Sequence, residues 1–298
     1  MSVLKTALAN PSRMQGIFRY LLHAKGQREK REVLERILSP DKLVEDKSSP
    51  RPMFRAALNE GLKCRLLIEE EEGLDIAINP DLPEEARNPQ LGTQLLPNTL
   101  ADLFFASDNE DEKDFGLDCA WYLAQDLYDA PGTWEEVEQR VNQQRVGDLL
   151  KLSSDRLFDQ LGDWMCYLGL AWRYALKEGN NLKKILVPDP TVYIRHNLNQ
   201  LFNGQIGNKI LLNEFINKLA IKCPLFETGH FRETIEANIG RRKPKYLSTS
   251  TAFALLRLQD EGYIQLIRES DADLMLLPKV NNQVDDDGRI SQIIYFGE

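Results

Sequence analysis

Apolar residues recur at steps of three and four in the first part of the chain, the spacing that places them on one face of an α-helix. A first stripe comprises Met14, Ile17, Phe18, Leu21 and Leu22. A second stripe ends at Ser39-Pro40 and comprises Val33, Leu34, Ile37 and Leu38. The Ser and Pro residues that follow suit the start of a third helix over residues 53–60.

Two apolar runs, CRLLI and LDIAI, follow the third helix, with an acidic turn and Gly73 between them. This pattern predicts a β-hairpin. The order helix, helix, helix, hairpin is typical of a winged helix. Residues 1–83 are therefore predicted to form an N-terminal winged helix.

The same order of elements returns near the C-terminus. Helical stripes lie in LLNEFINKLAI, HFRETIEANI and LSTSTAFALLRLQDEG, and the runs YIQLI and DLMLLP predict a hairpin. RISQIIYF predicts one more strand. Residues 205–298 are therefore predicted to form a C-terminal winged helix with an extra terminal strand. The two copies share little sequence, so they indicate a repeated architecture rather than a duplicated sequence.

The region between them, residues 84–204, is predicted to be a helical middle domain. TWEE, from Thr133, has the pattern of a capping box. RLFDQLGDWMCYLGLAWRYAL reads as the most apolar helix of the chain, with Trp164 and Trp172 on its stripe. The predicted fold class is α+β and mostly helical, with two winged-helix units flanking this middle domain.

Charge narrows the range of partners without deciding among them. The 298 residues carry a formal net charge of -9, which argues against a general polyanion binder. The acidic residues are clumped in turns, however, so local basic faces are compatible with this charge. No apolar run approaches the roughly 20 residues that span a bilayer. The N-terminus also lacks the apolar core of a signal peptide, so a cytoplasmic protein is expected.

Motifs that carry catalysis are missing from the sequence. Its histidines, His23, His196 and His230, lie outside any HExxH motif, and GxSxG, GxGxxG and GxxxxGK[ST] do not occur. The cysteines are Cys64, Cys119, Cys166 and Cys223, far apart and without a histidine pair nearby, so no metal site is expected. The sequence thus predicts a non-enzymatic protein without a cofactor.

Two sets of residues are candidates for nucleic-acid contact. Arg51, Arg55 and Asn59 are spaced four apart on the third helix of the first unit, and such side chains can bind phosphates or base edges. Arg241, Arg242, Lys243 and Lys245 form a basic loop before the third helix of the second unit, suited to phosphate contacts. The alternative for both sets is a solvated surface. Acidic turns at 69–72 and 269–273 argue against insertion of either wing tip into a groove.

A third candidate lies in KKILVPDPTVYIRHNLNQLF, which predicts a helix capped by Asp189 and started by Pro190. The favoured interpretation is a structural helix that links the middle domain to the second winged helix. The alternative is that Arg195 and His196 on its polar face contact phosphate or a partner.

Several segments together resemble the DpdG family. They are NPSRMQGIFRYLL near the N-terminus, LSP at the end of the second helix, WYLAQDLYDAPGTWEEVE, and LVPDPTVYIRHNLNQLF. DpdG proteins are encoded beside bacterial systems that install and police 7-deazaguanine bases in DNA. The resemblance implies a cytoplasmic accessory of such a modification and restriction system, acting against foreign DNA with ATPase or helicase partners. It supplies no catalytic residue for this chain.

The resulting expectation is a DNA-binding adaptor of an antiviral defence system. It would hold double-stranded DNA and recruit an ATPase or helicase partner. The alternatives are a protein-interaction scaffold without DNA contact, a winged-helix transcriptional regulator, which usually binds its operator as a symmetric dimer, and an unrecognised nuclease or hydrolase.

Overall fold

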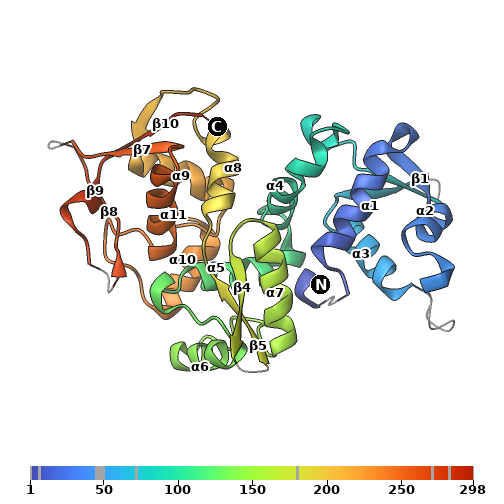
Figure 1. The fold of residues 1–298 in the computed structure, drawn as a ribbon, viewed down its shortest axis with the longest axis horizontal. Helices are drawn as coiled ribbons and strands as arrows, with labels where there is room; N and C mark the ends of the chain where they lie inside the picture. Colours follow the sequence, from blue (N-terminus) through green and yellow to red (C-terminus); the bar gives the residue numbers. More distant parts are fainter. Residues whose placement is uncertain are drawn as a thin grey trace. The chain divides into compact units, whose positions relative to one another are not determined.

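The computed structural model describes residues 2–5, 8–43, 51–70, 73–178, 181–269, 272–280 and 283–297. The chain is α+β, with helices and small antiparallel sheets, and forms two compact units, residues 1–113 and 114–298 (Figure 1). The helices are α1 (Pro11–His23), α2 (Arg31–Leu38), α3 (Pro52–Lys63), α4 (Gly92–Phe104), α5 (Lys113–Leu123), α6 (Trp134–Gln144), α7 (Asp155–Tyr167), α8 (Thr191–Leu201), α9 (Leu212–Lys222), α10 (His230–Ile239) and α11 (Thr249–Asp260). The strands are β1 (Arg28–Lys30), β2 (Leu67–Glu70), β3 (Asp75–Ile78), β4 (Trp172–Glu178), β5 (Asn181–Val187), β6 (Lys209–Leu211), β7 (Ile264–Ile267), β8 (Met275–Leu276), β9 (Arg289–Ile290) and β10 (Gln292–Tyr295).

The predicted helices and hairpin of the first unit are confirmed. All five residues of the first predicted stripe are buried in α1, which packs against α3 and α4. Asn10 caps α1 by accepting a hydrogen bond from the Arg13 backbone N–H at 3.0 Å. Strand β1, between α1 and α2, was not predicted because its three residues are all charged. It pairs with β3, which gives an antiparallel sheet of order β1-β3-β2.

A buried carboxylate fixes the first residues of the chain within this unit. Glu112 is fully buried and accepts hydrogen bonds from the Val3 backbone N–H at 2.8 Å and from the Ser2 hydroxyl at 3.2 Å. Its other oxygen lies 2.7 Å from the ammonium of Lys63, at the end of α3. Burial raises the pKa of Glu112, and Lys63 opposes that rise.

In the second unit, α5, α10 and α11 are joined by buried polar groups. The Leu123 carbonyl, at the end of α5, accepts hydrogen bonds from the Arg232 guanidinium at 3.1 Å and the Ser250 hydroxyl at 2.7 Å. Both donors are fully buried. Gly116 lets α5 approach α10, because a Cβ atom there would come within 2.5 Å of the Phe231 ring.

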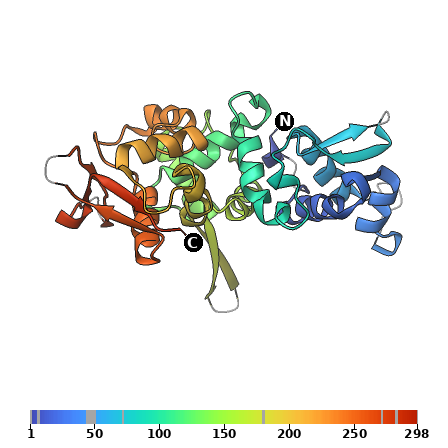
Figure 2. The same ribbon diagram turned by 90° about the horizontal axis from the view of Figure 1, so that it is seen from above.

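The helix predicted to run through Trp172 is wrong in its second half. Helix α7 ends at Tyr167, and Gly169 has φ of +77°, a left-handed conformation that favours glycine. Trp172 then begins strand β4 and is 46% exposed rather than part of a core stripe. Strands β4 and β5 form a hairpin that projects from the helices of its own unit (Figure 2). The capping box at Thr133 and Glu136 is confirmed.

The predicted C-terminal hairpin of YIQLI and DLMLLP is also wrong. Strand β7 pairs with β10, the predicted terminal strand, and β8 pairs with β9. Strand β6 was not predicted; it lies on the other side of β10, which gives a sheet of order β6-β10-β7. Helix α8 packs against both α9 and α11.

The division predicted at residues 83 and 204 stays a prediction. All four cysteines lie among the described residues and are free thiols; Cys166 is half-buried and the other three are buried. Burial raises the pKa of the Cys64 thiol to about 12. Within the described part of the chain, every helix is too short or too polar to cross a lipid bilayer.

Candidate nucleic-acid interface

Helix α3 presents two of the three residues predicted to share a face. Pro52 occupies its first turn, and Phe54, Ala57 and Leu58 are buried beneath it. The helical period therefore leaves Arg55 and Asn59 exposed on the opposite side, one turn apart. A guanidinium and a carboxamide on one exposed ridge can donate to phosphates and read base edges.

Arg51, the third residue of this set, lies outside the helix. It is the N-cap residue of α3, with a left-handed backbone of φ 59°. Its Nε donates to the Ser39 carbonyl at 2.8 Å, and its guanidinium pairs with Asp41. Only 13% of the side chain is exposed. The structure thus gives Arg51 the role of tying α3 to the end of α2.

Arg55 has a carboxylate neighbour that the sequence pattern did not reveal. Its Nε lies 3.2 Å from Oε1 of Glu35 on α2, and 52% of the Arg55 side chain is exposed against 17% of Glu35. A phosphate that approaches Arg55 therefore meets a nearby negative charge. Glu35 weakens the attraction of this surface for polyanions.

Should α3 contact duplex DNA, we expect Glu35→Gln to strengthen that binding by about threefold to tenfold at low salt, because it removes the repulsion by Glu35. The measurement is fluorescence anisotropy of a labelled duplex. Glu32→Gln removes an exposed carboxylate from the same helix and is the matched control. Equal gains in both variants would show that only net charge matters, not the contact with Arg55.

The carboxylates of β2 are paired with cations of β1 and of the start of α2. Arg28 pairs with Glu70 at 3.2 Å, and Arg31 pairs with Glu69 at 2.9 Å. The rest of the predicted acidic turn, residues 71 and 72, lies outside the described residues. The positive charges of Arg28 and Arg31 are thus balanced by β2. Strand β2 itself carries no cationic side chain, whereas α3 carries Arg55.

The basic loop of the second unit is largely committed to internal contacts. The Arg242 guanidinium pairs with Glu227 and Glu236, the latter at 2.5 Å, and donates to the Glu227 carbonyl at 3.0 Å. Lys245 pairs with Asp273, and the Lys243 ammonium lies 5.6 Å from the centre of the Tyr246 ring. Arg241 is exposed. Arg242 is thus a structural anchor.

The N-terminal end of α11 is covered within its own unit. Thr249 accepts a hydrogen bond from the Leu127 backbone N–H at 2.8 Å, and Ser250 donates to Leu123. Thr249, Ser250 and Thr251 are all buried. A helix that enters a DNA groove presents its N-terminal residues to the bases. Helix α11 therefore lacks the exposed end that α3 has.

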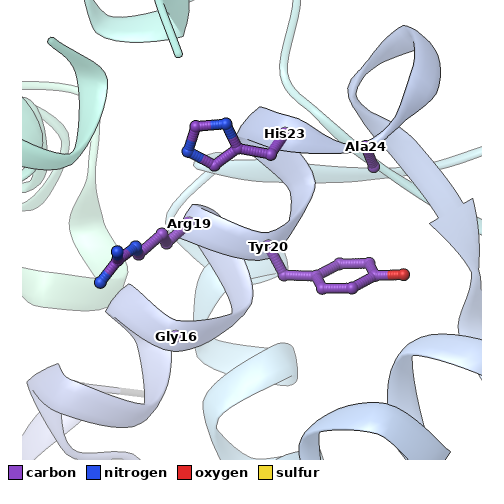
Figure 3. A pocket seen from close by; sticks show the side chains of 5 residues that line it. All are labelled: Gly16, Arg19, Tyr20, His23 and Ala24. Carbon is purple, nitrogen blue, oxygen red and sulfur yellow. The ribbon is translucent and has the colours of Figure 1, made fainter. Parts of the chain in front are cut away.

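The surface pockets beside α1 and at the β4–β5 hairpin do not bring together a nucleophile, a base and an oxyanion donor among the described residues. One, of about 420 Å³, follows α1 past Arg19, Tyr20 and His23; Arg19 and His23 point away from Tyr20, whose hydroxyl donates to Glu29 at 3.1 Å (Figure 3). Another, of about 480 Å³, mixes basic and acidic side chains at the base of the β4–β5 hairpin. No three potential metal ligands gather within the described ranges.

Comparison with known proteins identifies a family. A family profile described as DpdG-like matches residues 1–272. The chain belongs to the DpdG-like family. No curated protein and no solved structure matches it. Membership associates the chain with dpd systems, the context of 7-deazaguanine modification of DNA.

In this DpdG-like chain, the segment around α8 makes contacts within its own unit. Asp189 is buried and accepts a hydrogen bond from the Thr191 backbone N–H at 3.0 Å, although the N-cap residue of α8 is Pro190 and not the predicted Asp189. Its second oxygen pairs with Arg257 on α11 at 2.9 Å. Arg195 lies 3.8 Å from Glu261 and over the Tyr263 ring, whereas His196 is exposed.

Proposed function

We propose that this DpdG-like protein is a non-enzymatic DNA-binding adaptor, and that α3 is the element that contacts duplex DNA. The observation that carries the proposal is the arrangement of the first unit. Its elements follow the order α1-β1-α2-α3-β2-β3, with a sheet of order β1-β3-β2, and the third helix exposes Arg55 and Asn59. This order supports a winged helix whose recognition helix is α3.

The second unit supports a second winged helix with different boundaries from those predicted. The series α8-β6-α9-α11-β7-β10, with a sheet of order β6-β10-β7, matches the first unit element by element. In both units a three-residue strand runs directly into the second helix. On this proposal α8, not α9, is the first helix, and both α10 and the β8–β9 pair are insertions.

The two proposed winged helices differ in the exposure of their third helices, α3 and α11. Residues of α5 and of the segment after it cover the start of α11, while Arg55 and Asn59 on α3 are exposed. We therefore assign DNA contact to the first unit. The second unit has a structural role and offers surfaces for an ATPase or helicase partner of the dpd system.

The proposal predicts that Arg55→Ala/Asn59→Ala weakens binding of a labelled duplex at least about tenfold, as measured by fluorescence anisotropy. Arg241→Ala/Lys243→Ala removes two exposed cationic side chains from the basic loop of the second unit and is the control. The control should bind within about threefold of the wild type, the change expected for long-range charge alone. Loss of binding in the control alone would move the DNA site to the second unit.

The competing function is a protein-interaction scaffold, which the net charge of -9 and the Glu35 contact favour. Failure of the wild type to bind duplex at low salt, together with nuclease-resistant co-purification of a dpd ATPase, would establish it in place of the DNA adaptor. A transcriptional regulator would instead bind one operator sequence as a symmetric dimer.

A further inference from the structure

The β4–β5 hairpin has one face anchored to its unit and one face turned outward. The strand register puts Arg173 beside Leu186 on the anchored face. There the Arg173 guanidinium lies 2.7 Å from Asp163 on α7, and Leu186 is 2% exposed. The Tyr122 hydroxyl also donates to the Leu186 carbonyl at 2.8 Å. These contacts hold the base of the hairpin in one orientation.

Side chains alternate between the faces of a strand, so the outward face carries the other register pairs. They are Trp172 with Val187, Tyr174 with Ile185, and Leu176 with Lys183. Trp172 is 46% exposed and Leu176 is 44% exposed. The rings of Trp172 and Tyr174 lie 5.1 Å apart with 33° between their planes, so they form one continuous aromatic surface.

The hairpin also concentrates positive charge. Lys177, Lys183 and Lys184 lie on it, and none of them makes an ion pair with another described residue. By the same alternation Lys183 belongs to the outward face, and Lys177 and Lys184 belong to the opposite face. Arg28, Arg31 and Arg55, by contrast, each lie beside a carboxylate. A chain with a net charge of -9 thus places Lys183 on the same face as an aromatic pair, with Lys177 and Lys184 on the opposite face of the same hairpin.

We propose that the outward face of the β4–β5 hairpin binds single-stranded nucleic acid. This ligand carries both flat apolar rings and regularly spaced negative charges, the two features that the face complements. Bases in a duplex are already stacked on one another, so a strand with free bases fits the aromatic pair better. The site is separate from α3 and does not depend on duplex binding by that helix.

The neighbouring cleft of about 480 Å³ does not serve this purpose. Its lining includes Arg173, Lys183 and Lys184 but also Glu135, Asp155 and Asp159. These carboxylates repel phosphates, and Asp159 lies 3.6 Å from the Arg173 guanidinium. The nucleic-acid strand is therefore placed on the outward face of the hairpin, over the rings of Trp172 and Tyr174.

The test is anisotropy of labelled oligothymidylate and oligouridylate with the full chain. Trp172→Ala should weaken binding by about tenfold or more, whereas Trp172→Phe, which keeps a ring, should retain most of it. Tyr128→Ala removes a ring of similar exposure, 43%, elsewhere in the same unit and is the control. Lys183→Ala should reduce the salt dependence of binding.

No binding of either oligonucleotide by the wild type would overturn the proposal, as would equal binding by Trp172→Ala and Tyr128→Ala. Thermal melts of every variant identify any loss that arises from unfolding, and Trp172→Phe then decides the role of the ring. Measuring duplex binding by the same variants distinguishes the α3 site from the hairpin site. Trp172→Ala should leave it intact, and Arg55→Ala/Asn59→Ala should leave single-strand binding intact.

Discussion

Arg242→Ala is expected to destabilise the second unit by about 3–5 kcal/mol, the range for breaking a buried ion pair from one side. Glu227 is 2% exposed and Glu236 is 9% exposed, so both carboxylates would lose their cation in a poorly solvated place. Burial lowers the pKa of the Arg242 guanidinium to about 10, which keeps it charged at neutral pH. Glu227 also accepts a hydrogen bond from the Ser248 hydroxyl at 2.7 Å, so the start of α11 is affected as well.

The measurement is thermal or urea unfolding of Arg242→Ala beside Arg241→Ala. The neighbouring exposed residue should change stability by no more than about 0.5 kcal/mol. A loss of about 3 kcal/mol or more lowers Tm by about 6–12 °C for a unit of this size. Wild-type stability of Arg242→Ala with impaired DNA binding would instead give Arg242 the phosphate-binding role that its sequence position suggested.

Asp118→Asn is expected to stabilise the protein increasingly as the pH rises from 5 to 8 and to have little effect below pH 4. Asp118 lies on α5 and is fully buried; one oxygen accepts the Lys151 backbone N–H at 3.0 Å, and the other has no hydrogen-bond partner among the described groups. Burial raises the pKa of Asp118 to about 8. The folded protein therefore keeps the proton that the unfolded chain releases near pH 4.

The sign of the pH effect follows from this difference in proton binding. Asp118 contributes stability below pH 4, and this contribution decreases as the pH rises through 8, by about 1.4 kcal/mol for each pH unit between the two values. The variant should thus gain several kcal/mol over the wild type between pH 5 and pH 8 in urea unfolding. Asp148→Asn controls for loss of an exposed carboxylate. A difference that is constant with pH would show that Asp118 does not titrate in this range.

The sequence predicts those elements whose burial is periodic. The α1 stripe, the hairpin of β2 and β3 and the capping box at Thr133 each have a local signature, and the structure confirms them. Strands β1 and β6 lack a signature, because three-residue strands are too short to show alternation and their pairing depends on a distant strand. The β4 strand of the β4–β5 hairpin does have a local signature, because WRYALK alternates with a period of two after Gly169. The helical stripe that ends at Leu168 precedes it directly, so the sequence predicts one helix across both patterns.

The candidate site was predictable in its helical part only. A spacing of four places Arg55 and Asn59 together, whatever surrounds the helix. The partners of the other cations are set by tertiary structure. Arg51 lies ten residues from Asp41, and Arg242 lies 15 residues from Glu227, so the sequence gives no sign that these side chains are paired.

The most direct test of duplex binding by α3 is the salt dependence of anisotropy for the wild type and Arg55→Ala. The plot of log affinity against log salt should be shallower in the variant by about one, the change expected for one lost phosphate contact. Parallel plots with equal affinities would contradict the assignment of Arg55. Absence of duplex binding by the wild type at low salt would contradict the DNA adaptor as a whole.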